Sequence, residues 1–264
     1  ICTLRGGEPA IDAIAAMADW SEARARWLAD APARDARRLP APSVPEMSGQ
    51  VPSDAAAACL EAAGVPLARA RLATTPQEAV AAAEALGCPV ALKIESPDIA
   101  HKTEIGGVEI GLADAEAVRD AAERILARAA EHMPQARLSG LLVQEMKRGE
   151  VDLVVGLRED PVFGMVVMAG LGGVLVEVLE DVVFRKAPVT EAEADRMLSR
   201  LRGAAILDGV RGRPGVNRAA LAAFVARVSE FGAANAGRLE ELDLNPVLAT
   251  GTDVVAVDWL MVNK

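Results

Sequence analysis

The stretch ALKIESPDIAHKTEIGGVEIGL, residues 91–112, combines two apolar segments with a polar loop that carries His101, Lys102 and a Gly-Gly pair. The chain has two histidines in all, and one of them stands beside a lysine in this loop. An ordinary polar loop between two strands would explain the pattern, and so would a site that handles phosphate. The rest of the sequence has to separate these two interpretations.

Lys93 lies in the apolar segment before the loop, between Leu92 and Ile94, and this segment is expected to form a strand. Burying a lysine without a partner is costly, because its charge loses water. Two interpretations remain open at this point. The segment is either an edge strand that points Lys93 into water, or a strand that points Lys93 into a cleft where it meets an anion.

Gly106 and Gly107 have no Cβ, so that their backbone N–H groups can approach a ligand closely. Lys102 adds a positive charge nearby. Most Gly-Gly pairs are ordinary turns, and this signal for phosphate is weak by itself. A second glycine-rich stretch, GLGGV at residues 170–174, does not fit the dinucleotide fingerprint, because it is not G-x-G-x-x-G and no helix follows it.

An acidic pattern near the C-terminus suggests a metal site. Asp243 and Asn245 alternate along an expected strand, and Glu241 precedes them on the same face. The turn ATGTD, residues 249–253, separates two apolar runs and predicts a hairpin that brings Asp258 across from this face. Carboxylate and amide oxygens suit Mg²⁺, which keeps waters and nucleotide phosphates as further ligands. The solvated face of a hairpin would show the same alternation.

Composition excludes several classes of function. The chain has 264 residues, is 52% hydrophobic and carries a net charge of −10, so it can bury a sizeable core in one large or two small domains. The acidic charge argues against nucleic-acid binding. We also expect no membrane span and a cytoplasmic location, because no apolar run nears ~20 residues and no signal-peptide pattern is seen. Cys2, Cys59 and Cys88 are scattered and indicate a reducing compartment without a zinc site.

Residues 9–29 predict one amphipathic helix that has no core of its own. Five prolines follow between positions 32 and 52 and indicate a linker. After the linker, capping residues precede each helical pattern, and the expected N-caps are Ser53, Thr75, Asp114, Thr190 and Asn217. Together these marks predict a β-α-β-loop-β-α order over residues 65–133 and a second half that is richer in strands.

The order of these features resembles the ATP-grasp fold. The stretches at residues 91–112, REDPVFGMVVMAGLGGVLVEVLEDVVFRKAPV at 158–189 and ELDLNPV at 241–247 are similar to the ATP-grasp part of ADP-forming (NDP-forming) acyl-CoA synthetases. These enzymes are relatives of the succinyl-CoA synthetase β-subunit, and the resemblance covers about residues 45–264. It implies a mixed α+β and α/β chain with two α+β subdomains and the nucleotide cleft between them.

The resemblance also implies a domain organisation. Residues 1–30 look like the terminal helix of an upstream ligase/CoA-binding region, and residues 31–52 would be the linker. Subdomain 1 would span residues 53–143 and subdomain 2 would span residues 144–264. We therefore expect a partner region with CoA-binding and ligase domains, either fused upstream or present as a separate subunit, in an oligomeric protein.

Site roles follow from the resemblance residue by residue. Lys93 resembles the lysine that holds the ATP α-phosphate, and His101 with Lys102 resembles the pair that carries or holds the transferred phosphoryl group. The remaining matches are the loop over the phosphates (Gly106, Gly107, Val108), the adenine-binding stretch (Gln144, Glu145, Met146) and the Mg²⁺ ligands (Asn245 and Asp258, with Asp243 beside them). Asp152 stands where the family usually has a ribose-binding glutamate, and Glu150 is the alternative for that contact.

The implied reaction converts ATP, a carboxylate and CoA into acyl-CoA, ADP and phosphate through a phosphohistidine. ATP and Mg²⁺ are the expected cofactors, with CoA bound in the complete enzyme, and acyl specificity would lie mainly in other domains. Two alternatives remain: a regulatory module of the kind fused to protein acetyltransferases, without turnover, and an ATP-grasp ligase that makes an amide. The histidine in the loop favours phosphoryl transfer over both.

Overall fold

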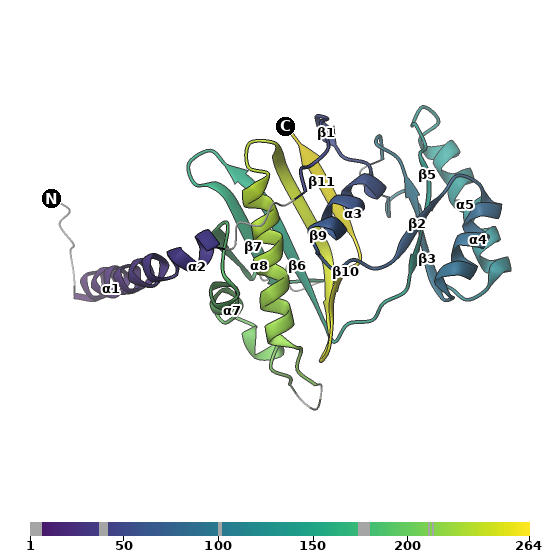
Figure 1. The fold of residues 1–264 in the computed structure, drawn as a ribbon. Coiled ribbons are helices and arrows are strands. Elements are labelled where there is room, and N and C mark those ends of the chain that lie inside the picture. Colours follow the sequence, from purple (N-terminus) through teal and green to yellow (C-terminus); the bar gives the residue numbers. More distant parts are fainter. Residues whose placement is uncertain (1–6, 37–41, 100–101, 174–179, 211, 213) are drawn as a thin grey trace. The chain divides into compact units, whose positions relative to one another are not determined.

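The computed structural model describes residues 7–36, 42–99, 102–173, 180–210, 212 and 214–264. The chain divides into two units, residues 1–39 and 40–264, and each is described by itself. The first unit contains α1 (Gly7–Ala29) and α2 (Ala31–Ala36) (Figure 1). The helix predicted at residues 9–29 is thus confirmed. No residue of α1 is buried, and its exposed apolar side chains are Ile11, Ile14, Met17, Trp20, Trp27 and Leu28.

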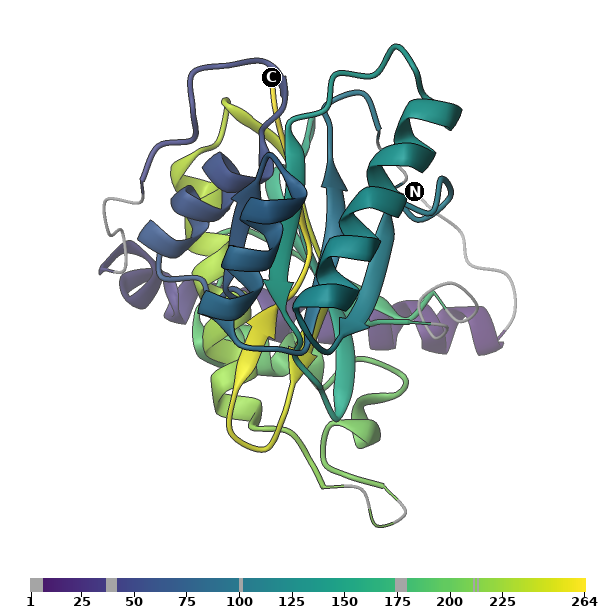
Figure 2. The ribbon, with the colours of Figure 1, turned by 90° about the vertical axis from the view of Figure 1, so that its right-hand side faces the viewer.

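The first sheet of the second unit, called here the small sheet, has four antiparallel strands in the order β2-β5-β3-β4. Its strands are β2 (Ala70–Ala73), β3 (Val90–Glu95), β4 (Val108–Leu112) and β5 (Gly140–Glu145). Helices α4 (Pro76–Leu86) and α5 (Ala115–His132) lie side by side on one face of it (Figure 1, Figure 2). Both begin as predicted, because the side chains of Thr75 and Asp114 accept hydrogen bonds from backbone N–H groups of the first turn.

Strand pleating separates the two faces of the small sheet. Leu92, Ile94 and Leu141 belong to the core under α4 and α5. Lys93 pairs with Leu142 in the register, so that both side chains lie on the opposite face. Leu142 belongs to the core of the other sheet. The second face of the small sheet is therefore directed toward the larger half of this unit.

The second sheet, called here the large sheet, is built from seven strands in the described residues, in the order β1-β11-β9-β6-β7-β8 with β10 paired to β9. Its strands are β1 (Gly49–Gln50), β6 (Val151–Asp160), β7 (Gly164–Leu171), β8 (Val182–Lys186), β9 (Leu239–Ala249), β10 (Val254–Ala256) and β11 (Trp259–Asn263). The predicted hairpin after β9 is confirmed, with Val254 opposite Ala249. The second apolar run of this hairpin forms two strands, because β10 and β11 both pair with β9.

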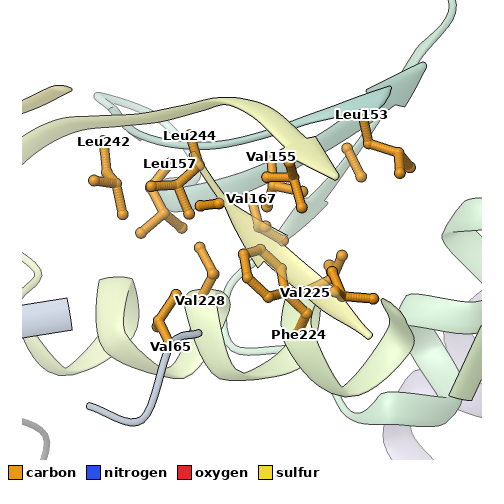
Figure 3. Packing of buried hydrophobic residues seen from close by; sticks show 14 of the residues in the cluster. Val65, Leu153, Val155, Leu157, Val167, Phe224, Val225, Val228, Leu242 and Leu244 are labelled. Atoms are coloured by element: carbon orange, nitrogen blue, oxygen red, sulfur yellow. The ribbon is translucent and has the colours of Figure 1, made fainter. Parts of the chain in front are cut away.

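Helices pack on one face of the large sheet. Among them are α7 (Glu191–Leu198), the short 3-10 helix η1 (Ala204–Ile206) and α8 (Arg218–Ala234). Figure 3 shows Phe224, Val225 and Val228 of α8 directed at Val155 and Val167 of the sheet, and all five are buried. The other face carries the polar side chains of β9. No helix in the described part of the chain is long and apolar enough to cross a membrane.

Helix α3 (Ser53–Ala62) differs from its sequence prediction in two respects. Pro52 occupies the N-cap position, Ser53 is already the first helical residue, and no side chain caps the helix. The predicted capping role of Ser53 is therefore wrong. In addition, α3 packs on β11, and its Leu60 lies in the core of the large sheet, although α3 precedes the small sheet in the chain.

The segment expected as a linker is more ordered than its prolines indicate. Val44 and Val51 are buried in the core of the large sheet. The Val44 N–H donates to Asn235 Oδ1 at 2.9 Å, and Asn235 Nδ2 donates to the carbonyl oxygens of Pro42 and Phe231. Prolines remove donors from this segment, but the carbonyl oxygen of Pro42 still accepts a hydrogen bond from Asn235.

We predict that Asn235→Ala lowers the free energy of unfolding by about 1–3 kcal/mol, because it leaves buried backbone groups without partners. Urea denaturation monitored by circular dichroism measures the change. Glu240→Ala, at an exposed position near the start of β9, is the matched control and should stay within about 0.5 kcal/mol of the unmodified chain. Equal stability of the two variants would contradict the anchoring role of Asn235.

Candidate active site

Lys93 is the centre of the site. Strand β3 lies between β5 and β4, so that Lys93 is on an interior strand and the edge-strand interpretation is excluded. Lys93 is buried, with 8% of its surface exposed. The Lys93 Nζ atom lies 3.3 Å from Oδ2 of Asp258 and donates a hydrogen bond of 3.0 Å to the carbonyl oxygen of Val257. The lysine of the small sheet therefore reaches the β10–β11 junction of the large sheet.

Electrostatics explain why Asp258 is needed there. Burial lowers the pKa of Lys93, and the neighbouring Asp258 carboxylate opposes this effect. The charge of Lys102 also lowers the pKa of Lys93, whereas the charge of Glu95 raises it. Each ammonium group has a carboxylate partner, Asp258 for Lys93 and Glu95 for Lys102, so that this region carries two positive and two negative charges.

The acidic residues of β9 lie as the alternation predicts. Leu242 and Leu244 are buried, whereas Glu241 and Asp243 are partly exposed and Asn245 is exposed. Burial, followed by the charges of Glu241 and Asp258, raises the pKa of Asp243. A bound cation would reduce the repulsion between the Asp243 carboxylate and these two neighbouring carboxylates.

Whether these residues fit Mg²⁺ depends on the donor set. Within the described residues, no group of three or more His, Cys, Asp or Glu side chains is arranged as a complete metal site. Asp243 and Asp258 supply hard carboxylate oxygens, and Asn245 supplies an amide oxygen. This set fits Mg²⁺, because the ion needs only one or two carboxylates when phosphates and waters complete its shell.

The glycine loop is held closed by its own hydrogen bonds. Gly107 N donates to Lys102 O at 2.8 Å, and Gly106 N donates to Thr103 O at 3.1 Å. A Cβ on Gly107 would lie 2.6 Å from Ile94 Cγ2 and 2.8 Å from the Lys102 carbonyl oxygen, so that only glycine fits. The N–H groups of both glycines therefore donate within the loop, which differs from the sequence expectation that they would be free to approach a ligand. Val108 continues into β4 opposite Lys93.

Of the two residues predicted to carry or hold the phosphoryl group, the structure describes Lys102 only. His101 lies outside the described residues. The Nζ atom of Lys102 contacts the carboxylate of Glu95, a residue that sequence reasoning did not single out. The spacing from Lys93 to Glu95 is the signal that could have found it, because residues i and i+2 of a strand share a face.

The predicted adenine-binding stretch lies at the end of β5. Gln144 is buried, and its Nε2 atom has no hydrogen-bond partner among the described residues. The Glu145 carboxylate forms ion pairs with Arg69 and Lys147, and the Met146 N–H donates to Pro89 O at 3.3 Å.

Asp152 is exposed near the start of β6. The register places the next residue, Leu153, opposite Val247, and both belong to the core of the large sheet. Asp152 therefore lies on the other face, which β9 supplies with Asp243. A pocket of about 370 Å³ follows this face, with Arg158, Met168, Phe184 and Asp243 among its lining residues.

These features define a class of protein with two α+β halves, in which a lysine from one sheet meets an aspartate at the β10–β11 junction of the other. The chain belongs to the ATP-grasp domain family, because residues 45–262 match that domain. The ATP-grasp fold expected from the sequence is thereby confirmed.

Two curated relatives in this family are ADP-forming CoA ligases. The chain is 41% identical over 189 residues to 4-hydroxybutyrate–CoA ligase (ADP-forming) of Nitrosopumilus maritimus, which covers 72% of this chain and 27% of the relative. It is 38% identical over 199 residues to the β subunit of ADP-forming acetate–CoA ligase I of Pyrococcus furiosus, which covers 75% of this chain and 85% of that subunit. The chain thus spans less than a third of the first relative and most of the second.

A solved structure agrees in sequence and in fold. Dinucleotide-forming acetyl-coenzyme A synthetase 1 of Ca. Korarchaeum cryptofilum superposes with a TM-score of 0.79 at 36% identity, over 82% of this chain and 94% of that chain. That structure is described as a complex with coenzyme A, Ca-AMPCP and HgCl⁺.

An ion pair fixes the residues between β3 and the loop. Arg137 Nε donates to Asp98 Oδ2 at 3.0 Å, Arg137 Nη2 donates to Oδ1 at 2.8 Å, and the Arg137 N–H also reaches Oδ2 at 2.8 Å. These bonds lower the pKa of Asp98 to about 2. They hold the segment after Lys93 to the segment that leads into β5.

We predict that Arg137→Gln moves the Asp98 pKa up toward its ordinary value of 3.8. Because the folded-state pKa is depressed, the pair stabilises the protein above about pH 4, and this contribution is lost as the pH falls toward 2. Carboxyl ¹³C NMR titration and denaturation at several pH values measure both effects. Arg119→Gln, an exposed change on α5, is the control, and an Asp98 titration identical in both variants would contradict the assignment.

Proposed function

We propose that this chain is the nucleotide-binding and phosphoryl-transferring module of an ADP-forming acyl-CoA synthetase. The observation that carries the proposal is the buried Lys93 of the small sheet, which meets Asp258 at the β10–β11 junction of the large sheet. A nucleotide triphosphate with its divalent cation matches both partners, because the phosphates suit the lysine and the cation suits the carboxylates. The nucleotide analogue and cation in the Korarchaeum complex support the same assignment.

In this proposal each predicted residue has a defined task. Lys93 holds the α-phosphate, and Gly106, Gly107 and Val108 form the backbone of the loop over the phosphates. Adenine binds along Gln144, Glu145 and Met146, with ribose near Asp152. Asn245, Asp258 and Asp243 would hold Mg²⁺, which supplies positive charge against the β- and γ-phosphates. The protein contributes mainly placement and electrostatic stabilisation.

The phosphoryl acceptor in this proposal is His101. A neutral imidazole nitrogen forms an N–P bond with the γ-phosphorus while the bond from that phosphorus to the ADP oxygen breaks, and ADP leaves with the electron pair. Lys102 holds the transferring group. The phosphoryl group then passes to a carboxylate site, where an acyl phosphate and CoA give the thioester and phosphate.

The remaining parts of the reaction belong to a partner region in this proposal. The ligase and β-subunit relatives support a partner region with CoA-binding and ligase domains that is either fused to this chain or present as a separate subunit. In this proposal the complete protein is a cytoplasmic oligomer. Residues 1–30 would belong to that region, and the exposed apolar side chains of α1 support this assignment. The names of the relatives favour the ligase over the regulatory alternative.

We predict that Mg-ATP stabilises the chain by about 2.7 kcal/mol at a hundredfold excess over Kd, because it binds the folded state only. Lys93→Ala and Asp258→Ala should each abolish most of this stabilisation, whereas Lys264→Ala, an exposed lysine paired with Glu159, should keep it. Thermal unfolding with and without Mg-ATP measures the effect. The site is assigned wrongly if both cleft variants respond to Mg-ATP as the unmodified chain does.

We also predict that His101→Ala binds Mg-ATP with unchanged affinity and takes up no phosphoryl label. The assay uses γ-labelled Mg-ATP, with the CoA-binding and ligase domains present, and scores label that is acid-labile and base-stable, as expected of phosphohistidine. His132→Ala, at the exposed end of α5, is the matched control and should label normally. Equal labelling of the His101 variant would reduce this histidine to a binding residue.

A further inference from the structure

Glu95 is a buried carboxylate at the end of β3. It follows Lys93 by two residues, so that both side chains leave the same face of the small sheet. One carboxylate oxygen contacts the Nζ atom of Lys102, and the other accepts a hydrogen bond of 2.6 Å from Ser53 Oγ. The two carboxylate oxygens of Glu95 therefore join the glycine loop to helix α3.

Ser53 links the Glu95 carboxylate to Asp258. Ser53 is the first residue of α3, which packs on β11, and its carbonyl oxygen accepts a hydrogen bond of 2.8 Å from Trp259 Nε1. The Trp259 N–H in turn donates to Asp258 Oδ1 at 3.1 Å. Glu95 is thus connected, through two residues, to the carboxylate that meets Lys93.

Lys102 is held at both of its ends. Its carbonyl oxygen accepts the Gly107 N–H that closes the loop, and its ammonium group is held by Glu95. The Glu95 charge also acts on Lys93, in the opposite sense to the charge of Lys102. One carboxylate therefore serves two lysines, and it restricts the second of them to one position next to the first.

We propose that Glu95 is a positioning residue for phosphoryl transfer, which fixes the Lys102 ammonium beside the transferring phosphoryl group and ties the glycine loop to α3 and, through Ser53 and Trp259, to Asp258. The proposal rests on the function proposed above. A misplaced lysine weakens transition-state stabilisation much more than nucleotide binding, because several other groups hold the nucleotide. A merely structural ion pair would instead lower stability and affinity together.

The test compares Glu95→Gln, Glu95→Asp and Lys102→Met in the full chain with the CoA-binding and ligase domains present. Glu95→Gln keeps a side-chain oxygen for Ser53 but loses the charge that holds Lys102. We expect its Mg-ATP Kd to stay within about threefold of the unmodified value and its rate of phosphohistidine formation to fall about tenfold or more. Glu95→Asp, which keeps the charge, should recover part of the rate.

A double variant separates positioning from general damage. If Glu95 acts through Lys102, the Glu95→Gln/Lys102→Met protein should transfer no more slowly than Lys102→Met alone, because the effects are not additive. Glu104→Gln, in the same loop, is the control for a lost negative charge.

Two kinds of result overturn the proposal. A normal transfer rate in Glu95→Gln, or a loss of affinity as large as the loss of rate, overturns it while the proposed function stands. Absence of both Mg-ATP binding and label in the unmodified protein overturns the proposed function and this proposal together.

Discussion

The ion pair between Lys93 and Asp258 is the constraint on which the arrangement of the site depends. An ammonium group on an interior strand requires a partner, since its charge is largely removed from water. The small sheet offers Leu142 and Val108 beside it, neither of which can satisfy that charge. The partner comes from the β10–β11 junction, and the two sheets therefore meet at this point.

Polar contacts around this pair extend it into a chain from one sheet to the other. Hydrogen bonds join Asp258 to Trp259, Trp259 to Ser53, and Ser53 to Glu95. Glu95 lies in the small sheet, two residues after Lys93. Glu95, the buried carboxylate of this chain of contacts, has a partner for each of its oxygens, as a buried polar group requires. A change at any member is expected to be felt at the others, because the contacts share side chains.

The two apolar cores are separate from this series of hydrogen bonds, and they hold in place the strands and helices that carry its residues. One core lies under α4 and α5, and the other lies between α8 and the large sheet. Glycine at position 107 is required because Ile94 of the first core occupies the place of a Cβ. The shape of the phosphate loop is thus set by packing behind it, whereas its charge is set by Lys102 and Glu95.

Features that depend on neighbouring residues could be predicted from the sequence alone. Caps at Thr75, Asp114, Thr190 and Asn217 were predictable, since each depends on residues within one turn. Alternation along β9 and the hairpin after it were predictable for the same reason. The order of the motifs was also visible in the sequence, and its resemblance to a known family added the fold.

Tertiary structure decided the features that depend on residues far apart in the chain. Ser53 has the residue type of a cap, but its hydroxyl bonds to Glu95, 42 positions away. Residues 42–52 have the composition of a linker, but Asn235 anchors them from 191 positions beyond Val44. Lys93 could have faced water until β4 and β5 were paired on both sides of β3. In each case the local pattern allowed several partners, and the selection among them came from contacts that no short segment contains.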